Sequence, residues 1–139
     1  MASPYDVTVG EGFPYTGGNR AFVLEGLYDA TEQELVTTAV AEVINIPANT
    51  YVQQVFYKIE TGQGAARNFE VGDGDDVDGW VEATSSQTAG DWVMALVAAA
   101  YPTALGKLYT DADTIDVRSN GATLDACKIR VKAICFRVA

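Results

Sequence analysis

Hydrophobic and polar residues alternate most regularly near the end of the chain, in residues 127–138. One side of a strand there would carry the apolar residues Cys127, Ile129, Val131 and Ala133, and the other side would carry Lys128, Arg130 and Lys132. Such a period of two predicts a half-buried strand. After Ala133 the phase changes, because Ile134, Phe136 and Val138 are apolar as well. This change indicates a β-bulge or burial of both faces near the terminus.

Further segments with many β-branched and aromatic residues, bounded by turn residues, also predict strands. They are residues 21–27, 51–61, 67–71, 92–98 and 114–118. Only the turn Gly62-Gln63-Gly64 and two alanines separate the second segment from the third. We therefore expect these two segments to form a hairpin.

Residues 35–46 carry two conflicting patterns. Apolar residues recur there at a helical spacing, after Asp29 or Thr31 as a possible helix start: Leu35, Val36, Ala39, Val40, Val43 and Ile44. The threonine and valine content favours a strand, and Pro47 requires Ile46 to be extended. We expect a strand over residues 41–46, while residues 35–39 stay open between helix and strand.

The first twenty residues are broken by glycine and proline at Pro4, Gly10, Gly12, Pro14, Gly17 and Gly18. This composition predicts an extended arm with a short strand at residues 6–9. The arm either folds back on its own sheet or contacts another chain. Its candidate partner-contact residues are Tyr5, Phe13, Tyr15 and Arg20.

Many short strands, frequent turns and only one helical candidate predict an all-β protein. We expect an antiparallel β-sandwich of the jelly-roll type with at most one short helix. Residues 1–20 would form the arm and residues 21–139 a single domain, in keeping with a length of 139 residues.

The charge of the chain excludes several functions. Nineteen acidic residues stand against 9 Lys+Arg, which gives a net charge of -10, and histidine is absent. This charge opposes binding to nucleic acid and to anionic membranes, because phosphate backbones are bound largely through Lys and Arg. The absence of histidine excludes Ser-His-Asp triads and zinc sites that need histidine.

No secretion signal or membrane-spanning run is recognisable in the sequence. The chain begins without a basic and apolar leader, and its longest apolar run, residues 92–101, is about half the roughly 20 residues that cross a bilayer. We expect the chain to be made in a cytoplasm and to stay soluble there. Cys127 and Cys135 lie eight residues apart in one predicted strand, roughly 27 Å at 3.4 Å per residue, too far for a disulfide. They are interpreted as reduced core thiols, with an intermolecular bridge as the alternative.

Acidic residues concentrate in one loop, at Asp73, Asp75, Asp76 and Asp78. The spacing does not fit an EF-hand, because Gly74 and Ser85 stand where the first aspartate and the closing glutamate belong when Gly79 is the turn glycine. The loop is either a solvated turn whose carboxylates accept local backbone N–H groups or a calcium site. Paired carboxylates also serve glycoside hydrolysis, but here no residue would desolvate one of them, so we predict neither an enzyme nor a cofactor.

Two other features have both a structural and a functional interpretation. Residues 128–139 contain Lys128, Arg130, Lys132 and Arg137 and no acid, which indicates a strand face paired with neighbouring acids or a surface for an acidic partner. Trp80 and Trp92 flank a polar stretch and are either core residues or a carbohydrate platform.

Three segments, taken in order, resemble a known family. They are Ile46-Pro47-Ala48-Asn49-Thr50 leading into residues 51–55, then residues 69–75 with Asp78-Gly79-Trp80, and then residues 106–115. This order is similar to jelly-roll capsid decoration, or cement, proteins of tailed bacteriophages. The resemblance covers about residues 40–118 and part of the last strand.

The resemblance implies a noncatalytic β-sandwich that forms homotrimers on the outer capsid surface of the virion. It would bind the major capsid protein and stabilise the capsid against the pressure of packed DNA. The alternatives are a carbohydrate-binding jelly roll of a tail fibre or tip, which would use Trp80 or Trp92 with the acidic loop, or another head or tail component. A small-molecule ligand is not expected.

Overall fold

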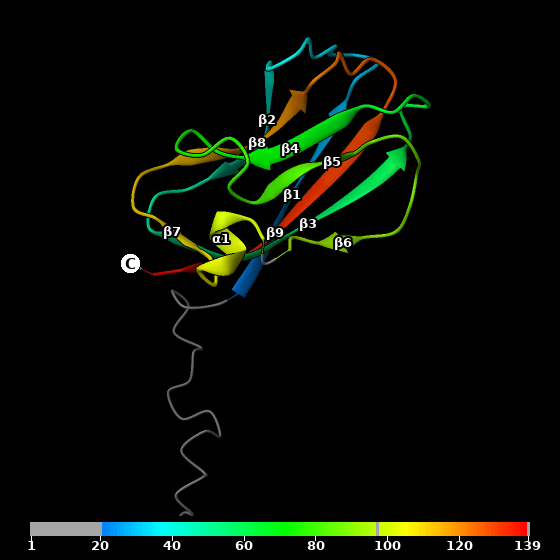
Figure 1. Ribbon diagram of the computed structural model, residues 1–139. Helices are drawn as coiled ribbons and strands as arrows, with labels where there is room; N and C mark the ends of the chain where they lie inside the picture. The colour runs from blue at the N-terminus through cyan, green and yellow to red at the C-terminus, as the bar shows by residue number, and fades with distance from the viewer. Residues whose placement is uncertain (1–20, 97, 139) are drawn as a thin grey trace, which may run out of the picture.

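The protein folds into a sandwich of two antiparallel β-sheets, as predicted (Figure 1). The structure is a computed structural model that describes residues 21–96 and 98–138. The predicted arm, including the strand at residues 6–9, lies outside the described residues.

The five-stranded sheet has the order β1-β9-β3-β6, and β7 also pairs with β3. Its strands are β1 (Ala21–Asp29), β9 (Lys128–Arg137), β3 (Thr50–Thr61), β6 (Val93–Met94) and β7 (Lys107–Tyr109). The four-stranded sheet has the order β2-β8-β4-β5. Its strands are β2 (Val40–Ile46), β8 (Asp113–Asn120), β4 (Asn68–Gly72) and β5 (Val81–Ser85). Successive strands mostly alternate between the two sheets, so residues distant in the sequence line one core.

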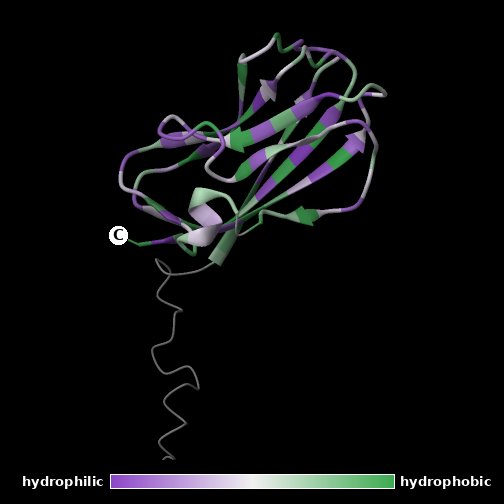
Figure 2. Ribbon diagram, in the orientation of Figure 1, coloured by the Kyte–Doolittle hydropathy of each residue, from purple (hydrophilic) through white to green (hydrophobic). Residues whose placement is uncertain are grey.

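The core lies between the facing sides of the two sheets. Val52 and Val131 of the five-stranded sheet and Phe69 and Val117 of the four-stranded sheet have no exposed surface. The alternation of apolar and polar residues along these strands is visible in Figure 2. Such alternation places one face of each strand in the core and the other in solvent.

The buried positions of β9 alternate without a break through Cys135. Ile134 and Phe136 are half-buried on the outer face, so the apolar phase change reflects partial burial of the second face rather than a bulge in β9. The register shifts lie on β3 instead, where Gln53 and Glu60 are the extra residues opposite β9.

The predicted hairpin of residues 51–61 and 67–71 is wrong. β3 pairs with β9, whereas β4 pairs with β8 and β5 in the other sheet. Gln63 explains the crossing, because its N–H donates to the Ser86 carbonyl at 2.8 Å and its side-chain oxygen accepts from the N–H of Cys127 at 3.2 Å. The turn is therefore held against two distant segments and leads the chain across the core.

The strand predicted over residues 92–98 is also wrong for most of its length. β6 contains only Val93–Met94, and the chain then leaves the sheet for the helix α1 (Ala100–Thr103). The run of alanines at residues 98–100 favours a helix over a strand. Within the described ranges α1 is the only helix, and no helix there is long and apolar enough to cross a membrane.

The structure of residues 35–46 resolves the conflict between the helical and the strand pattern. The strand predicted at residues 41–46 is present as β2. Leu35 is buried and pairs with Leu124 in an isolated bridge, and Thr38 has a φ of 68°. Residues 35–39 therefore form a bridge and a turn rather than a helix.

Candidate functional site

The acidic loop follows directly after β4. Asp73 accepts hydrogen bonds from the backbone N–H groups of Asp75 and Asp76, both at 3.0 Å, and Asp76 accepts one from Asp78 at 3.3 Å. These bonds confirm the predicted turn. Asp73 itself is not solvated as predicted, because it is only 2% exposed.

Residues of α1 and β7, about thirty positions further along the chain, enclose the carboxylate of Asp73. Lys107 donates to it at 2.7 Å, Tyr109 at 2.7 Å and Tyr101 at 2.9 Å. The indole N–H of Trp80 donates to the Tyr109 hydroxyl at 3.0 Å. A single buried network thus joins the acidic loop to α1 and β7.

The network keeps its charged members ionised. Burial by itself raises the pKa of Asp73, but the hydrogen bonds from Lys107, Tyr109 and Tyr101 outweigh it, so the pKa lies below its ordinary value. Burial lowers the pKa of Lys107, yet its bonds to Asp73 and Asp75 raise it above the ordinary value. A carboxylate and an ammonium held in their charged forms stabilise a structure, and neither is poised to exchange a proton near neutral pH.

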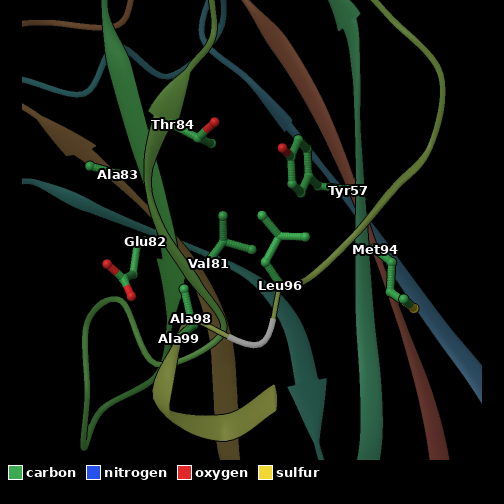
Figure 3. Close-up of a pocket in the computed structure, with 9 residues that line it drawn as sticks. All are labelled: Tyr57, Val81, Glu82, Ala83, Thr84, Met94, Leu96, Ala98 and Ala99. Atoms are coloured by element: carbon green, nitrogen blue, oxygen red, sulfur yellow. The ribbon is translucent and has the colours of Figure 1, made fainter. Parts of the chain in front are cut away.

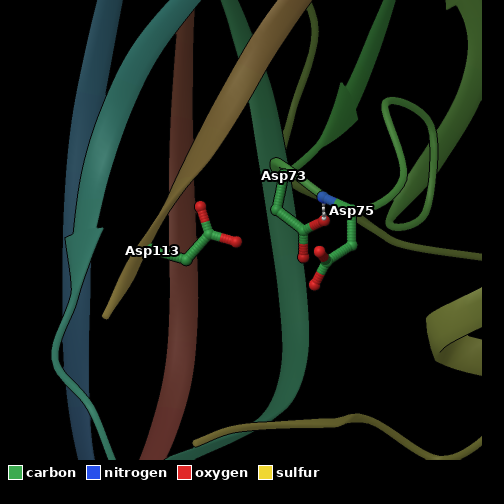
Figure 4. Close-up of side chains that lie close together, drawn as sticks. All are labelled: Asp73, Asp75 and Asp113. Atoms are coloured by element: carbon green, nitrogen blue, oxygen red, sulfur yellow. Dashed lines mark hydrogen bonds between the residues drawn. The ribbon is translucent and has the colours of Figure 1, made fainter. Parts of the chain in front are cut away.

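Three carboxylates of this region lie close together, as Figure 4 shows. Oxygen atoms of Asp73, Asp75 and Asp113 lie within 4.8 Å of one another. The ammonium group of Lys107 lies 2.7 Å from Asp73 and 2.8 Å from Asp75. The Lys107 ammonium supplies positive charge next to two of these carboxylates, so the cluster contains an ion-pair network.

Asp116 of β8 has the opposite electrostatic environment. Its pKa is raised from 3.8 to about 6. Burial is the largest cause, the hydrogen bond from Thr114 acts against it, and the negative charges of Glu42, Asp113 and Asp73 add to it. Thr114 donates to Asp116 at 2.6 Å. The charge of this carboxyl group therefore changes closer to neutral pH than that of an ordinary aspartate.

The two tryptophans have different environments. Trp80 has no exposed surface and packs edge-on against Tyr101, with ring centroids 5.2 Å apart, which confirms the core interpretation for this residue. Trp92 is half-buried, and the Lys132 ammonium lies 4.2 Å from its ring centroid. Trp80 therefore cannot contact a sugar, and a cation already covers one face of Trp92.

The basic last strand pairs with acids of the neighbouring strands, as one of the two interpretations predicted. Arg130 lies 2.6 Å from Glu60 and 3.5 Å from Glu25. Lys128 and Lys132 each lie 3.8 Å from a carboxylate, those of Asp29 and Glu25. Cys127 and Cys135 are free and buried, as predicted, and burial raises the pKa of each to about 11.

A cavity of about 150 Å³ opens between the two sheets at the edge formed by β5 and β6. Tyr57, Val81, Met94, Leu96 and Ala99 are among the residues around it (Figure 3). Its volume suits an apolar side chain rather than an extended ligand.

A second hollow, of about 590 Å³, lies on the outer face of the five-stranded sheet. The apolar and aromatic residues that line it include Tyr51, Phe56, Met94, Leu105 and Ile134, and Leu108 pairs with Tyr51 beside them. We call these six residues the outer apolar surface. No pattern in the sequence predicted this surface. The apolar residues Ile134 and Phe136 on the second face of the last strand were the available signal.

The predicted partner-contact residues Tyr5, Phe13, Tyr15 and Arg20 lie outside the described residues, so their contacts stay a prediction.

No protein-family model matches the sequence, and no curated protein matches it at a significant level. Solved structures do match the fold. A chain of the acidic stable capsid structure of Helicobacter pylori bacteriophage KHP30 has a TM-score of 0.62 and 9% identity, over 86% of this chain and 89% of that one. A chain of the cyanophage Pam1 capsid has a TM-score of 0.61 and 18% identity, over 99% and 92% of the two chains. A chain of the Ralstonia phage GP4 capsid has a TM-score of 0.61 and 14% identity, over 88% and 86%.

All three come from phage capsids. At these identities the likeness is one of fold. It extends over most of both chains in each comparison, so the whole sandwich is matched rather than a shared hairpin or a single sheet.

Proposed function

We propose that this protein is a noncatalytic structural component of a bacteriophage virion that decorates the outer surface of the capsid. It binds the major capsid protein as a homotrimer and stabilises the head. The observation that carries the proposal is the similarity of the whole sandwich to chains of three phage capsids. The resemblance of residues 40–118 to decoration proteins points to the same class.

The charge distribution supports a place outside the shell. A net charge of -10 is unfavourable beside packed DNA. Lys128, Arg130 and Lys132, which a phosphate backbone would need, are paired with acids of the same sheet.

The sandwich is further proposed to be a jelly roll. The strand orders β1-β9-β3-β6 and β2-β8-β4-β5 support this assignment, because each sheet interleaves strands from the two halves of the sequence. Such interleaving is expected when two Greek keys are wrapped into one sandwich.

A carbohydrate-binding function is disfavoured by the complete burial of Trp80. Another head or tail component would share the fold and differ in its partner. The three capsid matches favour the head.

The test is cosedimentation of the purified protein with heads that lack decoration. We expect saturable binding, with one trimer for each site and no binding to heads already decorated. Heads pelleted without the protein, at any concentration up to tens of micromolar, would remove this proposal.

The arm is proposed to make contacts between chains. Replacing Tyr5, Phe13, Tyr15 and Arg20 together with alanine should weaken binding to heads at least tenfold, because multivalent attachment depends on the trimer. Unchanged far-ultraviolet circular dichroism would show that the sandwich still folds. Wild-type affinity in this variant would exclude a role for these four residues.

A further inference from the structure

The outer face of the five-stranded sheet divides into two halves of different chemistry. One half carries the ion pairs of Glu25, Glu60, Arg130 and Lys132. The other half begins where Ile134 lies opposite Val23 and Phe136 lies opposite Ala21, and it contains the outer apolar surface. The charged half satisfies its own groups, whereas the apolar half is open to solvent.

Large side chains of the apolar half are strongly exposed. Leu105 is 77% exposed, Val23 56%, Met94 52% and Leu108 48%. Single exposed apolar residues are common, but a continuous group of them on one face marks an interaction surface. The described residues that line the hollow include no charged side chain.

The hollow results from an interruption of the edge strand. β6 pairs with Phe56 and Tyr57, and β7 pairs with residues 50–52, so both lie along the same side of β3 with a gap between them. The chain between them forms α1 and the turn at Leu105. The outer face of β3 is therefore left uncovered beside Met94 and Ile134.

Leu105 is held outward by its backbone. Its φ is 64°, a conformation that a leucine adopts at a cost, and its carbonyl accepts a hydrogen bond from the Tyr51 hydroxyl. The next residue must be Gly106, because a Cβ atom there would lie 2.5 Å from the Val52 carbonyl oxygen. Leu105 is therefore exposed at the rim of the hollow.

We propose that the outer apolar surface is the docking site for the N-terminal segment, residues 1–20, of a neighbouring copy of this chain, with Phe13 and Tyr15 entering the hollow. This inference rests on one part of the proposed function, the homotrimer, and names the surface through which its subunits would contact each other. The segment supplies aromatic and proline side chains, Tyr5, Phe13, Pro14 and Tyr15, for a hollow lined by apolar and uncharged groups.

The length and origin of the segment fit this site. β1 begins at Ala21, which pairs with Phe136, and Phe136 pairs with Tyr51 of the outer apolar surface. Phe13 precedes Ala21 by eight residues, which at roughly 3.3 Å per residue reach about 26 Å. The hollow lies two strands away from β1, about 10 Å at 4.8 Å per strand, so a segment with this reach is long enough to extend past the edge of its own sheet.

The direction of β1 favours a neighbouring copy. Ala21 stands at the end of the sheet, and a chain that continues the line of β1 backwards leaves the sheet instead of covering its outer face. Docking on its own face requires a reversal, for which Gly17 and Gly18 are the available residues. In a ring of three copies each segment reaches the next subunit, which closes a head-to-tail interface.

Disulfide trapping tests both the site and the identity of the occupant. The double variant Phe13→Cys with Met94→Cys is oxidised at low protein concentration and analysed on a non-reducing gel. We expect bands at two and three times the chain mass, which disappear on reduction. Cys127 and Cys135 do not interfere, because both have no exposed surface.

The matched control is Phe13→Cys with Val36→Cys. Val36 is 57% exposed, a fraction close to the 52% of Met94, and its carbonyl accepts a hydrogen bond from Ser119 of the other sheet. We expect no oligomeric band from this pair. A disulfide in the Met94 pair at the mass of a single chain would show that the segment docks on its own sheet, and the proposal would be wrong. Equal trapping in both pairs, or none in either, would also overturn it.

A second measurement does not depend on disulfide formation. Leu105→Glu with Met94→Glu should shift the sedimentation of the protein from trimer to monomer, whereas Val36→Glu should leave the trimer intact. Both variants change exposed positions, so both should fold. Neither measurement uses phage heads, so failure of the capsid proposal and failure of the docking proposal give different results. A trimer that persists in the double glutamate variant would contradict docking at this surface.

Discussion

Asp73 places an ionised carboxylate inside the sandwich, and its partners come from a separate part of the chain. Its side chain has no exposed surface and that of Lys107 is 16% exposed. Burial of such a pair is costly, and loss of one partner leaves an uncompensated charge. The stability of this end of the molecule therefore depends on one lysine.

Replacing Lys107 with methionine should lower the free energy of unfolding by about 3 kcal/mol at pH 7. The loss should shrink as the pH falls towards 4, because an Asp73 without Lys107 is relieved by protonation. Urea unfolding at the two pH values measures both effects. Lys128→Met is the control: it removes a surface pair with Asp29 whose atoms are 3.8 Å apart, and the urea midpoint should not change measurably. Equal losses in the two variants would contradict the assignment of a buried pair.

In the unmodified protein, Asp116 should affect stability in the sense opposite to Asp73, because its pKa is raised whereas that of Asp73 is lowered. Its folded pKa is raised from 3.8 to about 6, so the group disfavours folding above pH 6 and this penalty disappears as the pH falls to about 4. Asp116→Asn keeps an oxygen that accepts the Thr114 hydroxyl and removes the charge. We expect a gain on the order of 2 kcal/mol at pH 7 and no gain at pH 4, by urea unfolding. Glu82→Gln, at an exposed position, should show neither effect. A gain that is the same at both pH values would have another cause.

The residues that form this network show what a sequence can predict at this scale. The turn bonds within the acidic loop are local, and the aspartate and glycine spacing predicted them. Lys107, Tyr109 and Asp113 join the loop only because β7 and β8 pass beside it, at a separation in sequence that no local pattern encodes. The burial of Trp80 followed from residue type alone, whereas its bond to Tyr109 did not.

Among the elements, β9 was the most predictable, because its alternation extends over a whole strand in the middle of a sheet. The prediction that β3 and β4 form a hairpin was wrong. A turn motif shows that the chain turns, but it does not show which sheet the next strand joins. The strand predicted over residues 92–98 was wrong for most of its length. An apolar run is compatible with a strand, but the alanines at residues 98–100 favour the helix α1. Bulges at Gln53 and Glu60 depend on the partner strand and have no signal of their own.

A close contact between β1 and β2 fixes one closed edge of the sandwich. β2 has an extra residue, Val43, between its partners on β8. A Cβ atom at Gly26 of β1 would lie 1.9 Å from the Val43 carbonyl oxygen. The bulge and the glycine are therefore complementary, and this edge has no room for a side chain.

Gly26→Ala should destabilise the protein by about 3 kcal/mol, the upper end of the range for overpacking, because backbone must move to admit the methyl group. The urea midpoint measures the change. Gly90→Ala is the matched control, since an added Cβ there has no atom within 4 Å, and its midpoint should stay within experimental error. If Gly26→Ala unfolds at the wild-type midpoint, the two edges do not approach each other as described.

At the scale of the whole molecule, the net charge of -10 and the internal pairing of the basic strand have a consequence for assembly. The cations of the last strand are already paired within the sheet, whereas the outer apolar surface offers burial at about 25 cal/mol per Å². Under the proposed function, association among the subunits and with the shell should therefore depend on apolar contacts. Ionic contacts between exposed groups are screened within about 10 Å at 0.1 M salt, while apolar burial is not.

Raising sodium chloride from 0.05 to 0.5 M should change the dissociation constant for undecorated heads by less than about threefold, and the trimer should persist at both concentrations. Cosedimentation with heads and sedimentation velocity of the free protein give the two values. Leu105→Glu, which introduces charge on the outer apolar surface, should weaken the trimer at both salt concentrations, and Val36→Glu should have no effect at either. Binding that weakens more than tenfold with salt would contradict this prediction and would assign the interface to ionic contacts. The charged half of the outer face would then be the contact surface. Arg130 and Lys132 would have to exchange their partners in the sheet for acids of the shell.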